Sequence, residues 1–293
     1  MKRLFFSLLV SVMFVILFSG FSGLSAQSLA DIEAGRVALP NGWKLTPVGK
    51  KVSLGDLPLN LTLSASQRWL AVTNNGQSDQ SIQLYDIRKN SMADSVAVGK
   101  AWLGLAFSDD EKFLYASGGN DNWIVKFALA GGRLKAVDTL VLGKPWPALI
   151  SVAGIALDDS RHLLYAVTRE NNSLYTVDTG SGHVLARYPL GGEAYTCLLS
   201  PDRSRLYISC WGCNQVVLFD AVTQQLDGQV PVGDNPNDLC LSRNGEWLFV
   251  ANANDNTVSV INTRLRKVVE TLNTALFPDA PSGSDRKSTR LNS

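Results

Sequence analysis

Two of the four cysteines have a spacing that could support thiol chemistry. Cys210 and Cys213 form a Cys-x-x-Cys pair, and Cys197 and Cys240 lie in flanking segments. The pair ends a predicted β-strand, whereas thioredoxin-like redox chemistry would place it before a helix. We therefore expect buried thiols or a structural disulfide, joining Cys210 to Cys213 or Cys197 to Cys210. Zinc binding by the four thiols is the less favoured alternative.

Other catalytic patterns are weakly represented. The two histidines, His162 and His183, fall in predicted polar turns, and a metal-assisted hydrolase normally needs three protein ligands. The sequence has no Gly-x-Ser-x-Gly elbow and no phosphate-cradling P-loop. The Asn/Asp clusters at 120–122, 171–172 and 254–256 lack an EF-hand pattern and are typical of turns. We expect no catalytic residue, metal or cofactor in this chain.

The elements that must position any site recur along the chain. Five units begin at glycines spaced by 44, 44, 48 and 42 residues: Gly55, Gly99, Gly143, Gly191 and Gly233. Each glycine precedes a short apolar strand, a polar turn, a second strand, a further turn and two more strands. Four strands in a period of about 40–45 residues are typical of a propeller blade. The sequence thus predicts an all-β fold, a β-propeller of four-stranded blades over residues 42–276.

The repeat resembles the YVTN family of β-propeller repeats, through "LSPDRSRLYISC" and "LSRNGEWLFVAN". The segments "LPNGWKLTPVGKKVSLGDLPLN", "GGNDN", "ANANDNTVSVI" and "TALFPDAPSGS" further resemble a bacterial family in which a seven-bladed propeller precedes an alkaline-phosphatase-like phosphoesterase domain. The resemblance implies about five blades out of seven here, with the phosphoesterase domain as a missing C-terminal partner.

The strand count also indicates an incomplete ring. Residues 43–55 resemble a fourth strand that has no blade of its own, and residues 277–284 would begin a missing blade. We expect an open ring with exposed strand edges, which favour aggregation.

The entry points of the inner strands define a candidate ligand site. In propeller geometry they converge at the mouth of the central channel, which is a default place for a ligand. The alternative is that the aromatic residues pack between blades, and we favour packing for Trp102 and ligand contact for Tyr195. The candidate ligand-binding residues are Asn60, Trp102, Trp146, Tyr195, Thr196 and Asp238.

Both ends of the chain carry segments outside the repeats. Residues 1–26 have the basic start, apolar run and small residues of a signal peptide, with cleavage expected before Gln27 and an uncleaved anchor as the alternative. Residues 27–41 form an N-terminal lead. Residues 285–293, "DRKSTRLNS", resemble the translation of a sequencing adapter, and we interpret them as an artefactual tail.

These features predict an exported, periplasmic or extracellular binding or scaffold module that takes a small molecule or protein at the propeller mouth. After signal cleavage we expect no membrane partner. Without residues 1–26 and 285–293, the 27 Lys and Arg fall to 22 and the 26 Asp and Glu to 25. The remaining chain therefore has no excess of basic residues with which to bind nucleic acid. The alternatives are a propeller enzyme, lactonase-like or of the haem-d1 oxidoreductase type, or a cell-surface interaction protein.

Overall fold

The computed structural model describes residues 35–38, 42–45 and 51–275. These divide into two compact units at residue 53, and each unit is described by itself. In the first unit, β1 (Val37–Ala38) pairs antiparallel with β2 (Lys44–Leu45). The predicted strand over 43–55 is therefore reduced to Lys44–Leu45 within the described residues. A strand must pair its backbone groups, and β2 does so with the neighbouring β1.

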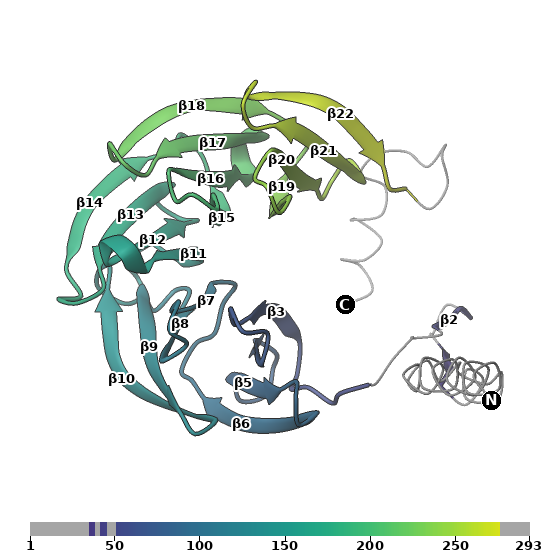
Figure 1. The fold of residues 1–293 in the computed structure, drawn as a ribbon, viewed down its shortest axis with the longest axis vertical. Helices are drawn as coiled ribbons and strands as arrows, with labels where there is room; N and C mark the ends of the chain where they lie inside the picture. The colour runs from purple at the N-terminus through teal and green to yellow at the C-terminus, as the bar shows by residue number, and fades with distance from the viewer. Residues whose placement is uncertain (1–34, 39–41, 46–50, 276–293) are drawn as a thin grey trace, which may run out of the picture. The chain divides into compact units, whose positions relative to one another are not determined.

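The second unit contains five antiparallel sheets of four strands, with strands in sequence order from the inside outward (Figure 1). Blade 1 contains β3 (Pro58–Leu63), β4 (Trp69–Asn74), β5 (Ser81–Asp86) and β6 (Ser91–Ala97). Blade 2 contains β7 (Leu105–Phe107), β8 (Phe113–Ser117), β9 (Trp123–Ala130) and β10 (Arg133–Val141). Blade 3 contains β11 (Val152–Asp158), β12 (Leu163–Thr168), β13 (Ser173–Asp178) and β14 (Val184–Pro189). Blade 4 contains β15 (Ala194–Leu199), β16 (Arg205–Cys210), β17 (Gln215–Asp220) and β18 (Gln225–Pro231). Blade 5 contains β19 (Pro236–Leu241), β20 (Trp247–Asn252), β21 (Thr257–Asn262) and β22 (Lys267–Asn273). The predicted β-propeller of four-stranded blades is confirmed.

The hydrophobic core of the second unit lies between blades. Four buried clusters join blades 1 and 2, 2 and 3, 3 and 4, and 4 and 5. Among the described residues no such cluster joins blade 5 to blade 1, and Figure 1 shows an arc with a gap between them. The expected open ring is thus confirmed.

The gap between blades 5 and 1 leaves one inner-strand position of blade 1 exposed, although the equivalent residues of other blades are buried. Leu105, Ile155 and Leu239 occupy equivalent places in blades 2, 3 and 5, and each is less than 9% exposed because it packs against the preceding blade. Leu61 holds the same place in blade 1 and is 59% exposed.

The repeated glycines are explained by close packing at two positions. A Cβ on Gly55 would lie 2.7 Å from Cγ of Asn74, and a Cβ on Gly233 would lie 2.6 Å from Nδ2 of Asn252. Both asparagines end the second strand of their blade, where their amides donate to hydroxyls of the third strand. The glycine therefore makes room for an asparagine that links two strands.

We expect the replacement of Leu105 by Ala to lower the free energy of unfolding by about 2–5 kcal/mol, the usual cost of truncating a buried leucine. The same change at Leu61 should cost less than about 1 kcal/mol, because its side chain already faces solvent. Urea unfolding of both variants measures the difference. Equal losses would show that Leu61 is covered in solution.

Candidate functional site

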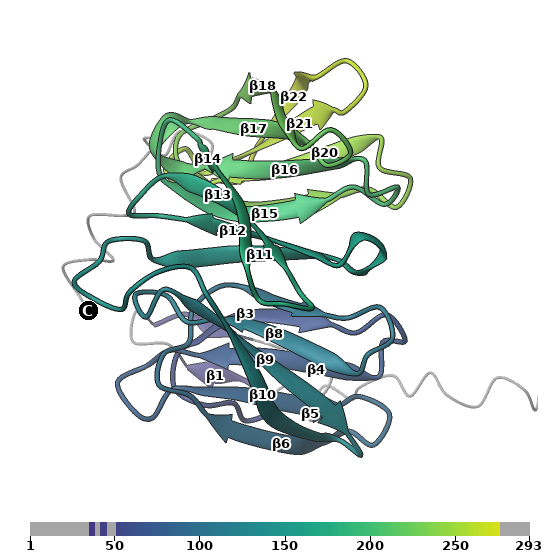
Figure 2. The same cartoon turned by 90° about the vertical axis from the view of Figure 1, so that its left-hand side faces the viewer.

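The blades place their turns at two opposite ends of the strands, as the edge-on view in Figure 2 shows. At one end lie the turns between second and third strands and the segments that enter the next inner strand. We call this end the entry face. Its turns are residues 75–80, 118–122, 169–172, 211–214 and 253–256.

Three of the predicted site residues come together in the channel. Asn60, Thr196 and Asp238 line one cavity of about 180 Å³, together with Gly104 and Gly154 of the intervening blades. The Asn60 amide donates a 2.5 Å hydrogen bond to the carbonyl of Leu103, and thus links blade 1 to the entry of blade 2. The inner strands of all five described blades contribute to this lining.

The two glycines of the channel are explained by packing. A Cβ on Gly104 would lie 2.5 Å from the carbonyl oxygen of Ala153, and one on Gly154 would lie 2.6 Å from Cα of Thr196. Real Cβ atoms do not approach backbone this closely. Inner strands of neighbouring blades therefore touch at these points without side chains between them.

The three predicted aromatic residues do not form one ring around the mouth. Trp146 is 65% exposed, so packing between blades does not account for it. Tyr195 stacks on Trp211, with ring centroids 5.5 Å apart and an interplanar angle of 29°. Trp102 is partly buried, packs against the core between blades 3 and 4, and lines a second cavity.

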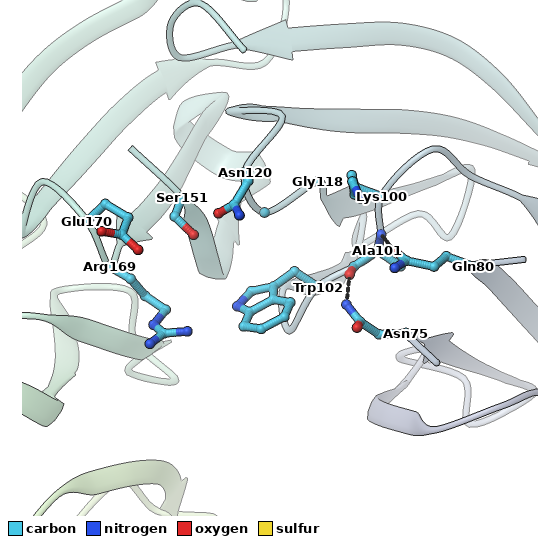
Figure 3. A pocket seen from close by; sticks show the side chains of 11 residues that line it. Asn75, Gln80, Lys100, Ala101, Trp102, Gly118, Asn120, Ser151, Arg169 and Glu170 are labelled. Carbon is cyan, nitrogen blue, oxygen red and sulfur yellow. Dashed lines mark hydrogen bonds between the residues drawn. The ribbon is translucent and has the colours of Figure 1, made fainter. Parts of the chain in front are cut away.

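This second cavity, the Trp102 cavity, lies on the entry face and has a volume of about 290 Å³. It is built by blades 1, 2 and 3, and Figure 3 shows its polar side chains around the indole ring. Its lining residues are Asn75, Gln80, Lys100, Ala101, Trp102, Gly118, Gly119, Asn120, Ser151, Arg169 and Glu170.

Hydrogen bonds fix the segment that carries Trp102. The backbone N–H of Ala101 donates to Oε1 of Gln80 at 2.7 Å, and the Asn75 amide donates to the carbonyl of Ala101. The N–H of Trp102 donates to the carbonyl of Ser117 at 3.1 Å. Asn75 and Gln80 thus use their side chains to hold this wall of the cavity.

An ion pair fixes the Nε side of the Arg169 guanidinium. Its Nε donates to Oε1 of Glu193, in the entry segment of blade 4, at 2.5 Å, and its backbone N–H donates to the carbonyl of Ser151 at 3.0 Å. The guanidinium carbon lies 5.8 Å from the ring centroid of Trp102, a cation–π contact. Within the described residues neither Nη atom makes a hydrogen bond, so this edge of the fork is available to a ligand.

Two further polar groups face the cavity without partners in the described chain. Ser151 is only 5% exposed, and its backbone N–H donates to Oδ1 of Asn122 at 2.8 Å. Its hydroxyl makes no hydrogen bond within the described residues and points into the cavity in Figure 3. The carboxylate of Glu170 is exposed, extends toward the same space and forms no ion pair there.

The buried Nε1 of Trp102 also lacks an acceptor among the described residues. Buried polar groups are normally hydrogen-bonded, and an exception calls for a specific explanation. In Figure 3 this nitrogen lies on the side of the ring nearest Arg169. Unused hydrogen-bonding capacity is thus concentrated around one ring.

The cysteines are free thiols in the structure. Cys210 and Cys213 flank Trp211 in the single-turn helix η2 (Trp211–Cys213), beside Gly192, whose missing side chain gives Sγ of Cys213 its space. Burial raises the pKa of Cys197 and, together with the adjacent Cys213 thiol, that of Cys210. A thiol with a raised pKa is a poor nucleophile. The pairing of Cys210 with Cys213 stays a prediction.

The described part of the chain contains no group of three or more His, Cys, Asp or Glu side chains placed to hold a metal ion. It also contains no helix with the length and apolar character needed to span a bilayer.

Sequence reasoning missed Lys100, Asn120, Ser151, Arg169 and Glu170. One signal in the sequence could have indicated this site. The equivalent turns of blades 1, 2 and 4 begin with the uncharged pairs Asn75-Gly76, Gly118-Gly119 and Trp211-Gly212, whereas the turn of blade 3 begins with the charged pair Arg169-Glu170.

Comparisons with known proteins agree with this architecture. A family model described as "Lactonase, 7-bladed beta-propeller" matches residues 193–273. The uncharacterized protein YncE of Salmonella typhimurium is 25% identical over 153 residues, which are 52% of this chain and 42% of that protein. Hydrazine synthase subunit beta of Kuenenia stuttgartiensis is 33% identical over 122 residues, 31% of this chain and 32% of that protein.

A solved structure shows the same fold. A functionally unknown protein from Desulfotomaculum acetoxidans superposes with a TM-score of 0.63 at 14% identity, over 73% of this chain and 71% of its own. The chain spans less than half the length of the curated relatives it matches. The chain is thus an all-β protein of the propeller class, similar to YncE and to lactonase-type propellers.

On the face opposite the entry face, charged side chains link the turns between the first and second strands of neighbouring blades. Asp158 is fully buried, and its carboxylate accepts from Ser160 and Arg161 at 2.5 Å and from Arg203 at 3.3 Å. Arg203, from blade 4, also reaches Asp109 of blade 2. The first turns of blades 2, 3 and 4 are joined by this network.

The network gives stability a pH dependence. Burial alone would raise the pKa of Asp158, but the hydrogen bonds from Ser160, Arg161 and Arg203 outweigh it and hold the pKa below 3.8. A carboxyl whose pKa is lowered by folding stabilises the protein above its unfolded pKa, and this contribution is lost as the pH falls through the folded value. Burial, together with Asp109 and Asp110, raises the pKa of the adjacent Asp159, which has the opposite effect.

We expect Asp158→Asn to lower the free energy of unfolding by about 1–3 kcal/mol at pH 7, the range for hydrogen bonds to charged groups. The difference in free energy of unfolding between the variant and the parent should become smaller from pH 4 to pH 2, because Asp158 becomes protonated in the parent. Asp159→Asn is the matched control and should be neutral or stabilising at pH 7. Urea unfolding of the parent and both variants at pH 7, pH 4 and pH 2 provides the measurement. A deficit for Asp158→Asn that is unchanged at low pH contradicts the assignment.

Proposed function

We propose that this chain is part of an exported propeller that binds a small polar molecule in the Trp102 cavity. The observation that carries the proposal is a set of polar groups around one partly buried indole that have no partner among the described residues: the Ser151 hydroxyl, the Nη edge of Arg169 and the Glu170 carboxylate. A cavity with an aromatic wall and a few convergent polar groups is the usual form of a ligand site.

The Trp102 cavity supports this proposal better than the channel. It is lined by blades 1 to 3, which are consecutive and packed on one another. The channel cavity is lined by all five described blades, including blades 1 and 5, between which the arc is open. Additional blades would change the channel without removing any wall of the Trp102 cavity.

We further propose that the chain is exported and that it belongs to a longer protein with a phosphoesterase domain. The signal-peptide pattern over residues 1–26 supports export to the periplasm or the cell exterior. The resemblance to propellers that precede a phosphoesterase domain supports a catalytic partner in the same polypeptide. In this arrangement the propeller supplies binding and the second domain supplies hydrolysis.

A lactonase-type enzyme is the second candidate, because the lactonase family model matches residues 193–273. The matched segment contains β15 to β22, which are blades 4 and 5. None of the residues that line the Trp102 cavity belongs to it. Hydrolysis of simple lactones by the purified chain would favour this candidate over the binding module.

We expect at least one class of small polar ligand to stabilise the protein and to lose this effect when Trp102 is replaced. Ligand at 100-fold excess over its Kd adds about 2.7 kcal/mol to the free energy of unfolding, or about 5 °C or more in melting temperature. Thermal unfolding is measured with neutral sugars, carboxylates, amines, amino acids and nucleosides on the parent, Trp102→Ala and Asn120→Ala.

Trp146→Ala is the control, because Trp146 is exposed and does not line the cavity. Asn120→Ala tests the cavity without disturbing the core that Trp102 touches. No stabilisation by any class, or the same stabilisation in all variants, would refute the proposal.

The fusion is tested by the genomic reading frame beyond Ser284. We expect it to encode further blades and then a region rich in Asp and His, because phosphoesterase metal sites use such ligands. A stop codon directly after Ser284 would remove the phosphoesterase from the proposal and leave the binding module.

A further inference from the structure

The charges of the Trp102 cavity are balanced but separated. Lys100 and Arg169 are cationic, and Glu170 and the buttressing Glu193 are anionic, so the four charges sum to zero. Arg169 pairs with Glu193, and no ion pair within the described residues joins it to the adjacent Glu170. The cavity therefore presents a cationic edge and a separate anionic group to the same space (Figure 3).

We infer that the ligand is a small zwitterion that carries both a carboxylate and an ammonium group, as a free amino acid does; this inference rests on the proposed binding function. The Nη edge of Arg169 has the fork geometry that binds a carboxylate through two hydrogen bonds. The Glu170 carboxylate has no partner among the residues that the structure describes, and a carboxylate accepts hydrogen bonds from an ammonium group.

A ligand with one charge fits this arrangement less well. A carboxylate alone would bind Arg169 but meet repulsion from Glu170, and an amine alone would bind Glu170 but meet repulsion from Arg169 and Lys100. Like charges brought together in a partly desolvated site weaken binding and exclude wrong partners. The charge pattern thus selects for a net-neutral, dipolar molecule.

The uncharged groups fit the remainder of such a ligand. The Ser151 hydroxyl and the Asn120 amide supply hydrogen bonds near the charged groups, and the Trp102 ring supplies an apolar surface for a short side chain. The volume of about 290 Å³ lies just below the usual range for ligand pockets, about 300–1,000 Å³, which favours a small molecule.

The test is calorimetric titration of the purified chain with glycine, L-alanine and L-serine. Acetate, which lacks the amine, and glycinamide, which lacks the carboxylate, are the matched probes. The variants are Arg169→Gln and Glu170→Gln, each of which removes one charge. Arg243→Gln and Glu270→Gln are the controls, because both residues are exposed and lie in blade 5, away from the cavity.

We expect saturable binding of at least one amino acid, and at least about ten-fold weaker binding of acetate and glycinamide. Arg169→Gln and Glu170→Gln should each weaken amino-acid binding about ten-fold or more, and the controls should leave it unchanged. Within the described residues the Glu170 side chain makes no hydrogen bond or ion pair, so Glu170→Gln remains informative if Arg169→Gln, which loses the Glu193 pair, unfolds.

Two results would overturn the inference and leave the proposed function intact. One is acetate binding that equals glycine binding and does not respond to Glu170→Gln, which means a simple oxyanion site. The other is the absence of amino-acid binding while another ligand class stabilises the protein in a Trp102-dependent way. Absence of binding by every class would overturn both proposals.

Discussion

The close approach of successive inner strands is the constraint on which the rest of this structure depends. At Gly104 and Gly154 one blade lies so near the backbone of the next that a methyl group has no space. This proximity lets each sheet bury one face on its predecessor, as Leu105 and Ile155 do. The core is therefore a series of interfaces between neighbours, each of which fixes the position of the following blade.

The same constraint explains why side chains from three blades can share one cavity. Lys100 and Trp102 enter blade 2, Asn120 lies in its turn, and Ser151 and Arg169 belong to blade 3. Each comes from a short segment tied by backbone hydrogen bonds, so the packed interfaces set their spacing. Blade 4 adds Glu193, which holds the guanidinium from behind. A binding site on rigid elements with a supporting layer needs little reorganisation when a ligand enters.

The sequence allowed the fold to be predicted because its signal is repeated five times. The spacing of the glycines and the strand pattern indicated the four-stranded blades, and the strand expected over residues 43–55, for which the sequence offered no blade, indicated an open ring. The convergence of Asn60, Thr196 and Asp238 also followed, because equivalent positions of a repeat must surround one axis.

The arrangement of the aromatic residues could not be predicted in this way. Trp102 and Trp146 precede inner strands and Tyr195 is the second residue of one, β15, but the directions of their side chains depend on contacts particular to each segment. Tyr195 turns toward Trp211 of its own blade, and Trp146 lies in a longer segment that leaves it exposed. Arg169 and Glu170 were missed because the turn they belong to resembles its polar counterparts, and only their charge separates them.

The exposed face of Leu61 has a consequence for how the chain fluctuates. In a stack of repeats that contact only their neighbours, a terminal repeat is held by one interface and an internal repeat by two. Blade 1 is such a terminal repeat in the described arc, so it undocks at a lower free energy than blades 2 to 4. Because Asn75 and Gln80 of blade 1 brace the wall that carries Trp102, undocking would also dismantle the cavity. Under the proposed function, a ligand in contact with blades 1 to 3 would oppose this undocking, so that ligand occupancy and amide hydrogen exchange in β4 and β5 would be coupled.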